Sequence, residues 1–291
     1  MQSMRVAAVQ CTATSDREQN LVRAGELVSQ AASQGAELIV LPEHFSLFGH
    51  AGVLRSSAEP RNGRVLEWAT SIAEEKGVWL VAGSSVELSA GRRYNTSCLV
   101  GPRGDLVATY RKVHLFDVDV PGAVSRESDA VAPGSRAVMA SIMPSDELPV
   151  PVGLSICYDL RFPELYRALT FAGALVVVVP SAFAAATGRH HWEILVRARA
   201  IENQVFLIAA GQVGTLPGGF EAYGHSMIVG PWGEILGELA DGPGFIVADL
   251  DLAAQQDARS TLPALTHRRP AAYRRVTEAV LGGDPTPVAE T

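Results

Sequence analysis

Cys157 has the sequence surroundings of a reactive thiol. The apolar run Val152–Ile156 has the length of a buried strand, and it gives way to polar residues at Cys157. Pro163 then predicts the first residue of a helix that extends to about Phe171. A thiol between a strand end and a helix N-terminus is expected to have a lowered pKa and to form the nucleophilic thiolate. A cysteine can equally be a small apolar packing group, so this segment leaves both roles open.

Three charged residues could complete a catalytic group with this thiol. Glu43 follows the predicted strand Leu38–Leu41, and Lys112 follows the predicted strand Leu106–Tyr110. A thiol nucleophile needs a base for its proton and a group that stabilises the oxyanion, and these two residue types fit. Glu127, further along, could bind a substrate amide or orient the lysine. Each could also be a solvated charge at a strand end.

The elements that must position these residues fall into two similar halves. In each half, apolar runs of strand length alternate with amphipathic helices, which is typical of sheets covered on both faces. We therefore expect an α/β fold in which two sheets pack face to face with helices outside. The predicted strands are Val6–Val9, Leu38–Leu41, Val78–Ala82, Val152–Cys157, Ala174–Val179, Val205–Ala210 and Phe245–Leu250; the helices are Asp16–Gly35, Arg64–Lys76, Pro163–Phe171 and about His191–Asn203; the hairpins are Tyr94–Val100 with Leu106–Tyr110 and Ser226–Val229 with Ile235–Gly237. Residues Asp117–Gly134 show little regular pattern and are predicted to form a long functional loop.

The composition narrows the class of protein. The 291 residues are 47% hydrophobic and 19% charged, with a net charge of −7, which favours a deep core and argues against a nucleic-acid surface. No apolar run approaches the roughly 20 residues that a membrane span needs, and the first residues lack a secretory signal. Three cysteines are an odd, sparse set that favours a reducing compartment. We expect a cytoplasmic enzyme without a membrane or nucleic-acid partner.

Three segments carry a resemblance to a known family. Leu41–Glu43, Tyr110–Phe116 and Ile156–Glu164 resemble, in order and spacing, the three signatures of the nitrilase (carbon–nitrogen hydrolase) superfamily. The resemblance implies a four-layer α-β-β-α sandwich, a Glu–Lys–Cys triad, no cofactor and no metal. It covers residues from Arg5 to about Arg275, so we expect one hydrolase domain over 1–275 and a C-terminal tail over 276–291.

The resemblance also implies a role for each matching residue. Glu43 corresponds to the general base, Lys112 to the stabilising cation and proton donor, and Cys157 to the nucleophile. Glu127 corresponds to the family's additional active-site glutamate. We expect the backbone N–H of Tyr158 to share the oxyanion with Lys112.

Further segments are similar to the branch of ω-amidases and deaminated-glutathione amidases, including Pro180–Phe183, Thr187-Gly188 and Tyr223–Met227. This implies an amidase for a small carboxylate-bearing amide, acting through a thioester, with Phe183 and Thr187 binding substrate. The chain departs from the branch at Arg189-His190, where Pro-Ala is usual, which adds bulk and charge near the expected pocket.

Other roles stay open at this point. Arg161 could pair with a substrate carboxylate or form a structural ion pair. The same triad could act on a nitrile or an N-carbamoyl compound, and a binding protein on the same fold is a further alternative. His190, His191 and Glu193 could suggest a metal, but adjacent histidines on a helix diverge.

Remaining features are expected to be structural. Cys11 and Cys98 lie in strand patterns and are predicted to be core residues, and Trp192 and Trp232 are predicted to pack. We also expect at least a homodimer, from two candidate apolar surfaces. These are the run Phe162, Leu165, Leu169 and Phe171, and the C-terminal residues Tyr273, Val276 and Val280.

Overall fold

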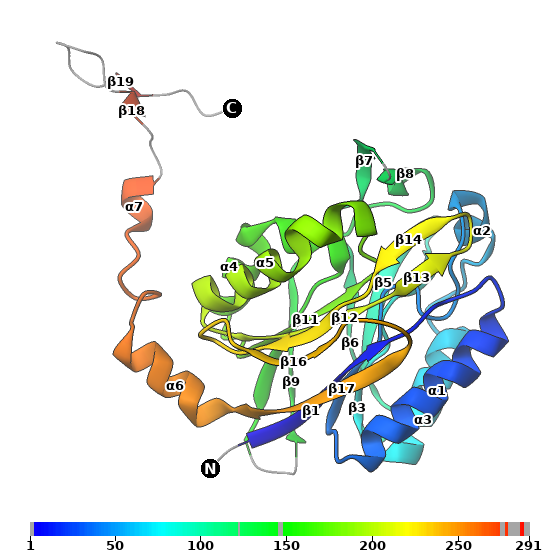
Figure 1. Cartoon of the computed structure of the whole chain (residues 1–291), viewed down its shortest axis with the longest axis horizontal. Coiled ribbons are helices and arrows are strands. Elements are labelled where there is room, and N and C mark those ends of the chain that lie inside the picture. The colour runs from blue at the N-terminus through cyan, green and yellow to red at the C-terminus, as the bar shows by residue number, and fades with distance from the viewer. Residues whose placement is uncertain (1–2, 122, 145–147, 274–276, 279–285, 288–291) are drawn as a thin grey trace.

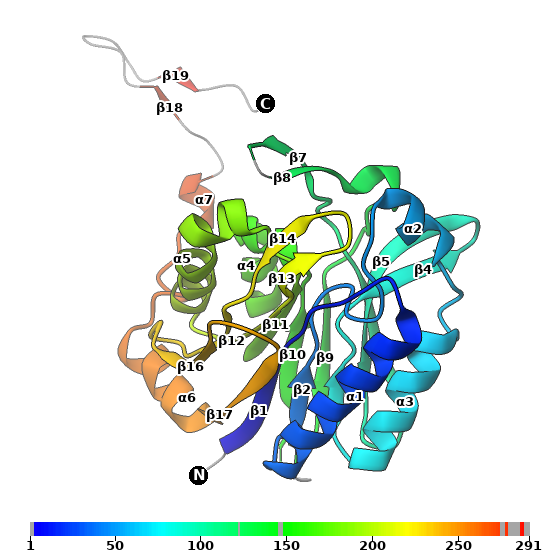
Figure 2. The same cartoon turned by 45° about the vertical axis from the view of Figure 1, so that its right-hand side comes forward.

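Two β-sheets lie face to face and are covered on their outer faces by helices, which is the predicted four-layer α-β-β-α sandwich (Figure 1). The computed structural model describes residues 3–121, 123–144, 148–273, 277–278 and 286–287. Helices α1 (Arg17–Ser33) and α3 (Arg64–Lys76) cover one sheet, and α4 (Pro163–Phe171) and α5 (Ala185–Asn203) cover the other (Figure 2).

The first sheet has seven strands in the order β17-β1-β2-β3-β5-β4, with β6 also paired to β5. Strands β1, β2 and β3 are parallel, whereas β5 runs antiparallel to β3 and β6 antiparallel to β5. Strand β6 therefore points the same way as β2, and both end at one edge of the sheet. The strands are β1 (Ser3–Gln10), β2 (Leu38–Val40), β3 (Trp79–Val81), β4 (Ser85–Ser89), β5 (Arg92–Val100), β6 (Leu106–Arg111) and β17 (Gly244–Asp251).

The second sheet has six strands in the order β16-β15-β12-β11-β10-β9. Its central strands β10, β11 and β12 are parallel, so their carboxyl ends also share one edge. In parallel sheets, this edge is where binding residues usually collect. The strands are β9 (Val138–Ile142), β10 (Val150–Leu154), β11 (Val176–Ser181), β12 (Phe206–Gly211), β15 (Ser226–Val229) and β16 (Ile235–Leu239).

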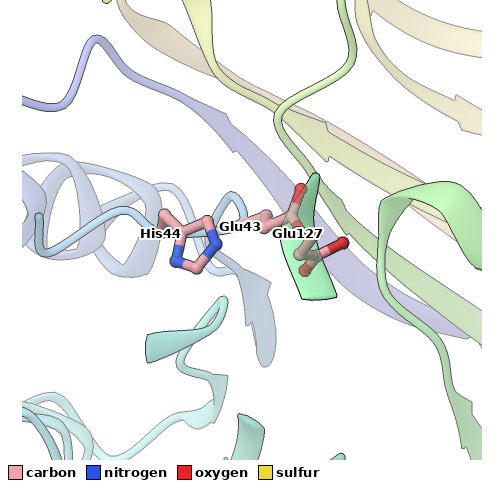
Figure 3. A group of neighbouring side chains, drawn as sticks. All are labelled: Glu43, His44 and Glu127. Atoms are coloured by element: carbon pink, nitrogen blue, oxygen red, sulfur yellow. The ribbon is translucent and has the colours of Figure 1, made fainter. Parts of the chain in front are cut away.

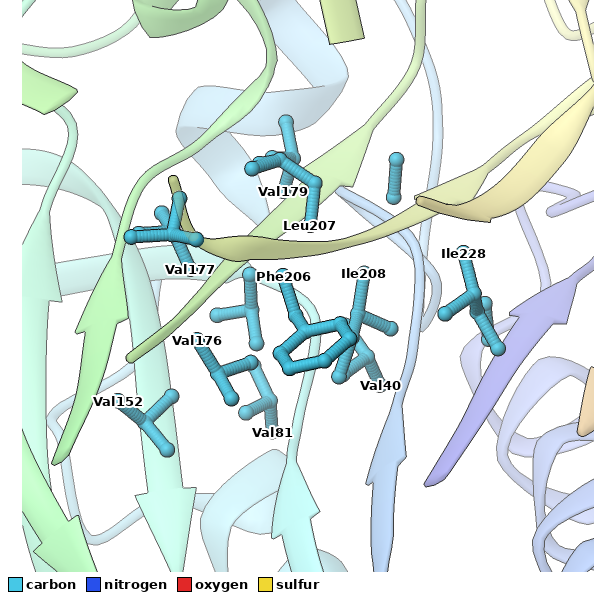
Figure 4. Packing of buried hydrophobic residues seen from close by; sticks show 14 of the residues in the cluster. Val40, Val81, Val152, Val176, Val177, Val179, Phe206, Leu207, Ile208 and Ile228 are labelled. Atoms are coloured by element: carbon cyan, nitrogen blue, oxygen red, sulfur yellow. The ribbon is translucent and has the colours of Figure 1, made fainter. Parts of the chain in front are cut away.

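The apolar runs are buried on both faces, as their lack of a polar face predicts. Alternate residues of β1 enter different cores: Val6 lies in the core between the sheets, and Val9 lies in the core under α1 and α3. Figure 4 shows Val40 of the first sheet in the same cluster as Phe206 and Ile208 of the second. Close packing between the sheets fixes their separation, and with it the distance between residues at their edges.

The boundaries of the four predicted helices agree with the sequence patterns, with one exception, whereas α2 (Ala51–Ser56) and α6 (Leu252–Thr261) were not predicted. The Asp16 side chain accepts a hydrogen bond from Gln19 N at 3.1 Å and caps α1, and Gly77 ends α3 at φ 64°. Helix α4 has the predicted bounds. Helix α5 begins at Ala185, six residues before the expected His191, because its first turn lacks the apolar spacing that marks a helix.

The stretch from Asp117 to Gly134 is more regular than predicted. Strands β7 (Asp117–Val120) and β8 (Ala123–Arg126) pair antiparallel, and the short helix η1 (Glu127–Asp129) follows. The sequence signal failed here because the hairpin is short and largely solvent-facing, with Val124 70% exposed.

The two tryptophans that were predicted to pack differ in burial. Trp192 is fully buried in the core between the sheets and their helices, as predicted, and its indole N–H donates to His225 O at 2.7 Å. The packing prediction for Trp232 is wrong, because this side chain is 59% exposed in the turn between β15 and β16. Cys11 is buried as predicted, whereas Cys98 on β5 is only partly buried.

The C-terminal part extends from the sandwich through α6 (Leu252–Thr261) and the short helix α7 (Pro270–Tyr273) to β18 (Thr277–Glu278) and β19 (Thr286–Pro287). Tyr273 is 61% exposed, while Val276 and Val280 of the proposed contact surface lie outside the described residues. The domain boundary after residue 275 stays a prediction. None of the helices in the described ranges is long and apolar enough to cross a membrane.

Candidate active site

The four predicted catalytic residues meet where strands of both sheets end. Glu43 lies just after β2, and Lys112 just after β6. Cys157 opens the 3-10 helix η3 (Cys157–Arg161) shortly after β10, and Glu127 opens η1. The backbone at Cys157 has φ 47°, a left-handed conformation that is uncommon for a residue with a side chain and that recurs at functional sites.

One glycine allows the loop that carries Glu43 to lie close to the segment that follows β3. Gly83, after β3, has φ 42°, and a Cβ at this position would collide with the carbonyl oxygen of Pro42. The next residue, Ser84, accepts a hydrogen bond at its Oγ from His44 N at 3.2 Å. Pro42 is thus held by close backbone packing against Gly83, and His44 by a hydrogen bond to the Ser84 hydroxyl.

Lys112 bridges the two glutamates. Its Nζ lies 2.9 Å from Glu43 Oε1 and 2.8 Å from Glu127 Oε2, and the lysine side chain is only 1% exposed. Two carboxylates and one ammonium give this buried group a net negative charge, provided that all three are ionised. Backbone donors stabilise the carboxylates: Ala182 N donates to Glu43 Oε2 at 2.9 Å, and Phe116 N donates to Glu127 Oε2 at 2.7 Å.

Burial and charge act in opposite directions on this group. Burial alone would raise the pKa of Glu43, but the charges of Lys112 and His44 and the hydrogen bonds from Lys112 and Cys157 lower it to about 2. Burial would lower the pKa of Lys112, yet Glu127 and Glu43 hold that pKa well above its ordinary value. Glu43 is therefore a carboxylate and Lys112 an ammonium at neutral pH.

The prediction of a lowered pKa for the Cys157 thiol is wrong. Burial raises the pKa of this thiol well above its ordinary value, and the adjacent Glu43 carboxylate raises it further. Lys112 and Ser181 act in the opposite direction but are outweighed. The helix N-terminus cannot compensate, because the thiol is removed from water beside a negative charge. The resting pair is therefore a thiol next to a carboxylate base.

Two residues that the sequence reasoning missed complete the cluster. The Asn95 side-chain amide, on β5, donates through Nδ2 to Glu43 Oε1 and to Glu127 Oε1, both at 2.9 Å. His44 is buried at φ 54°, with its Nε2 3.4 Å from the same Nδ2, and burial lowers the pKa of its imidazole. Asn95 could have been found from the sequence as a polar residue inside a predicted strand. His44 could have been found because it directly follows Glu43.

A cavity of about 330 Å³ gives access to the cluster. Its inner part includes Glu43, Lys112, Glu127 and Cys157, so the base, the ammonium and the thiol face one space. Aromatic and aliphatic side chains line the rest, together with a few polar groups near the β7–β8 hairpin. These further lining residues are His44, Phe48, Gly49, His50, Ala51, Leu54, Phe116, Val124, Ser125, Arg126, Asp129, Ala182, Pro217, Gly218 and Phe220. The volume suits a small organic substrate.

The four predicted substrate-binding residues are not among those that line this cavity. The Arg161 guanidinium lies 5.0 Å from the ring centroid of Phe183 and 5.8 Å from that of Tyr158. Thr187 Oγ1 donates to Ala184 O at 3.3 Å within α5. Their substrate roles stay predictions.

Glu43, His44 and Glu127 each present an atom that could bind a metal, and these atoms lie within 4.8 Å of one another (Figure 3). The Lys112 ammonium already bridges both carboxylates and supplies the positive charge that a metal would bring. The oxygen atoms of Glu43 and Glu127 are therefore arranged around the Lys112 ammonium and not around a metal ion. At the other candidate cluster, His191 Nδ1 lies 3.2 Å from Arg161 Nη1, a cation that disfavours a metal.

Comparison with known proteins identifies the family. Residues 5–260 match the carbon–nitrogen hydrolase family model. The chain is 43% identical over 281 residues to human deaminated glutathione amidase, covering 92% of this chain and 83% of that protein. It is 37% identical over 274 residues to human omega-amidase NIT2, covering 94% of this chain and 98% of that protein.

Solved structures similar to this chain belong to the same superfamily. Saccharomyces cerevisiae Nit3, from branch 10 of the nitrilase superfamily, superposes with a TM-score of 0.82 at 32% identity, covering 92% of this chain and 97% of that one. An amidase from Nesterenkonia sp. AN1 in complex with acrylamide has a TM-score of 0.74 at 31% identity, covering 93% and 96%. In another structure of that amidase, with a TM-score of 0.72, acrylamide has added to the active-site cysteine. The present chain therefore belongs to the carbon–nitrogen hydrolase family of the nitrilase superfamily, and it is a cysteine-dependent amidase.

Proposed function

We propose that this enzyme hydrolyses the amide of a small carboxylate-bearing compound, of the ω-amide or deaminated-glutathione type, through a thioester on Cys157. The observation that carries the proposal is the buried group of Glu43, Lys112 and Glu127 beside the Cys157 thiol, at the inner end of a cavity of about 330 Å³. Relatives named for deaminated glutathione and ω-amides support the substrate class.

In the proposed acylation, Glu43 accepts the proton of Cys157 as the sulfur attacks the amide carbonyl carbon. The carbonyl π electrons move to oxygen, and Lys112 and the backbone N–H of Tyr158 stabilise this oxyanion. The proton then passes to the amide nitrogen, the C–N bond breaks, and ammonia or an amine leaves. Acid release follows when Glu43 takes a proton from water, the hydroxide adds to the thioester carbonyl and the C–S bond breaks, and the thiol regains its proton.

The raised thiol pKa supports proton transfer that is concerted with attack. A free thiolate next to the Glu43 carboxylate would be unfavourable at this buried position. Once sulfur bonds to carbon, the negative charge moves to the carbonyl oxygen, where Lys112 can stabilise it. Lys112 is held charged for this purpose, because the two glutamates raise its pKa.

We propose two candidate partners for the substrate carboxylate. Arg126 is, among the described residues, the arginine that lines the cavity, and its Nη1 donates to Val118 O and Ser125 O, which fixes its position. Arg161 remains the earlier candidate, although it does not line the cavity. Arg126→Gln and Arg161→Gln, assayed with an amide that carries a carboxylate and with one that does not, distinguish them. The arginine that binds the carboxylate is the one whose loss raises KM only for the charged substrate.

We also propose a homodimer that works in the cytoplasm. In the predicted contact run Leu165 and Leu169 are buried, so support for self-association comes from Phe171 of that run together with Ile194 and Ile201 on α5, each at least 49% exposed. The three cysteines are free thiols, which suits a reducing compartment. Light scattering during a dilution series, alongside ammonia release, tests whether the active species is a dimer. Imaging of a tagged chain tests the location.

The reaction class is tested by ammonia release from a short dicarboxylate monoamide, with the matching nitrile and N-carbamoyl compound in parallel. We expect the amide to be the preferred substrate and mass spectrometry to find an acyl group on Cys157. Preference for the nitrile or the carbamoyl compound would replace the amide proposal, and absence of turnover on all three would favour a binding protein.

A further inference from the structure

We propose that Asn95 is a positioning residue that holds Glu43 and Glu127 together while Lys112 stabilises the oxyanion. The proposal rests on the function proposed above and names a residue that neither the three signature segments nor the comparisons assign. It concerns Asn95 inside β5, a residue that is 1% exposed.

Asn95 and Lys112 form two parallel bridges between the same carboxylates. Lys112 Nζ joins Glu43 Oε1 to Glu127 Oε2, and Asn95 Nδ2 joins Glu43 Oε1 to Glu127 Oε1. The backbones are also tied, because Lys112 N donates to Asn95 O at 2.9 Å. Both bridges therefore share one backbone anchor.

The orientation of the Asn95 amide follows from the charges around it. Its NH₂ group faces two carboxylate oxygens at 2.9 Å, whereas its Oδ1 is buried without a hydrogen-bond partner among the described residues. The opposite orientation would place a carbonyl oxygen against two anions. A buried acceptor is left unsatisfied so that both amide hydrogens serve the glutamates, which indicates that bridging is the purpose of this side chain.

The bridges made by Lys112 and Asn95 have different roles during the proposed reaction. Lys112 uses two of its three N–H donors for Glu43 and Glu127. When the third donates to the oxyanion, the charge of the ammonium is shared with a third anion, and its attraction to each glutamate is weaker. The Asn95 side chain is neutral, and its hydrogen-bond partners in the described part of the chain are these two carboxylates and His44, so its bridge can persist throughout turnover. Without it, two carboxylates of like charge would lose a shared donor at the moment when the ammonium is needed elsewhere.

The same contacts indicate which oxygen of Glu43 accepts the thiol proton. Oε1 already accepts from Asn95 and Lys112, whereas Oε2 accepts from one backbone group, Ala182 N. Oε2 therefore has the freer lone pair. Asn95 thus orients the base by occupying Oε1 and leaving Oε2 for Cys157.

The test compares Asn95→Ala and Asn95→Asp with wild type by the pH dependence of kcat and KM. The groups that face Asn95 and can titrate are Glu43, His44, Lys112, Glu127 and, beyond Glu43, Cys157. Loss of a donor to the carboxylates, and still more the addition of a third carboxylate, should move the acid limb of the profile to higher pH. We expect kcat to fall about 10- to 100-fold in Asn95→Ala, as for other residues that orient a reacting group, with little change in KM.

Ser97→Ala is the matched control. Ser97 lies two residues along β5, is fully buried, and has an Oγ with no hydrogen-bond partner in the described ranges. Its replacement changes buried polarity on the same strand without touching the glutamates, so the pH profile should stay as in wild type. A shift of equal size in Ser97→Ala would mean that disturbance of β5 explains the result, and it would overturn the proposal.

A second measurement separates this proposal from the proposed function. Iodoacetamide alkylates the Cys157 sulfur with loss of iodide, and peptide mass spectrometry follows its rate against pH without any turnover. We expect the pH dependence of labelling to shift in Asn95→Asp, which differs from asparagine in one side-chain group and should retain the fold. Unshifted labelling would refute the role of Asn95. A wild-type enzyme that labels normally but releases ammonia from none of the amides would instead refute the proposed function.

Discussion

Glu43 and Asp159 are both buried carboxylates within signature segments, but their partners differ. Asp159 accepts hydrogen bonds from Tyr110 Oη at 2.7 Å and Ile156 N at 2.9 Å, and its other oxygen meets His114 N and Nδ1 at 3.1 and 2.7 Å. It does not line the cavity. Glu43 has an ammonium and a thiol as neighbours and does line the cavity.

The difference in partners separates a carboxylate with a structural role, Asp159, from the proposed catalytic base, Glu43. The partners of Asp159 flank two of the proposed catalytic residues: Tyr110 and His114 lie two positions on either side of Lys112, and Ile156 immediately precedes Cys157. A saturated carboxylate therefore ties the lysine segment to the cysteine segment. Glu43 keeps an oxygen that can exchange a proton. Burial is common to both, so the kind of partner decides the role.

The largest expected effect is at the thiol that Glu43 serves. Cys157→Ala should lower turnover by about 10⁴-fold or more, because the covalent step is lost, while the fold remains. Ammonia release together with thermal unfolding checks both parts. Activity equal to wild type would contradict the proposed role of Glu43 as the base for this thiol, and would leave Glu43 with a structural role like that of Asp159.

Lys112→Arg should lower kcat by about 10²–10³-fold. A guanidinium keeps the charge, but its planar fork cannot replace a compact ammonium that lies 2.8–2.9 Å from two carboxylates. Steady-state kinetics on the preferred amide provide the measurement. Near-normal kinetics would mean that a positive field suffices and that the exact bridge is unimportant.

Asp159→Asn tests the structural side of the comparison. The amide places an NH₂ group against donors such as Tyr110 Oη and Ile156 N, so we expect a loss of roughly 1.5–3 kcal/mol in the free energy of unfolding. Urea denaturation measures it, and activity at low temperature should persist better than in Cys157→Ala. A stable but fully inactive variant would give Asp159 a chemical role.

The pH dependence of stability should distinguish Glu43 from Glu43→Gln. The folded pKa of Glu43 is about 2, below its ordinary value of 4.5, so its carboxylate contributes stability above pH 4.5. This contribution is lost as the pH falls through 4.5 toward 2. Denaturation at pH 7 and at pH 4 should therefore show that the free energy of unfolding falls more in wild type than in Glu43→Gln. Equal decreases in the two proteins would contradict the lowered pKa of Glu43.

The smallest effects are expected at the other two cysteines. Burial raises the pKa of both Cys11 and Cys98 to about 12, but neither lines the cavity. Cys11→Ala and Cys98→Ala should retain turnover and lose about 1 kcal/mol or less of unfolding free energy. Loss of turnover in either variant would weaken the assignment of the chemistry to Cys157 alone.

The sequence alone determined the layered architecture and the family motifs that carry the proposed catalytic residues. Strands such as Val176–Ser181 are recognisable because burial on both faces leaves a continuous apolar run, which is a local property. The segments around Glu43, Lys112 and Cys157 are contiguous motifs, so they could be read without knowing where they meet.

Only the tertiary structure decided the state and surroundings of these residues. The raised pKa of the Cys157 thiol depends on burial beside Glu43, which is 114 positions away along the chain, and the bridge made by Asn95 depends on β5 meeting the loops of Glu43 and Glu127. The cavity likewise draws on Arg126 instead of Arg161. Desolvation and hydrogen bonding are set by groups that converge from distant segments, and local sequence patterns carry no record of that convergence.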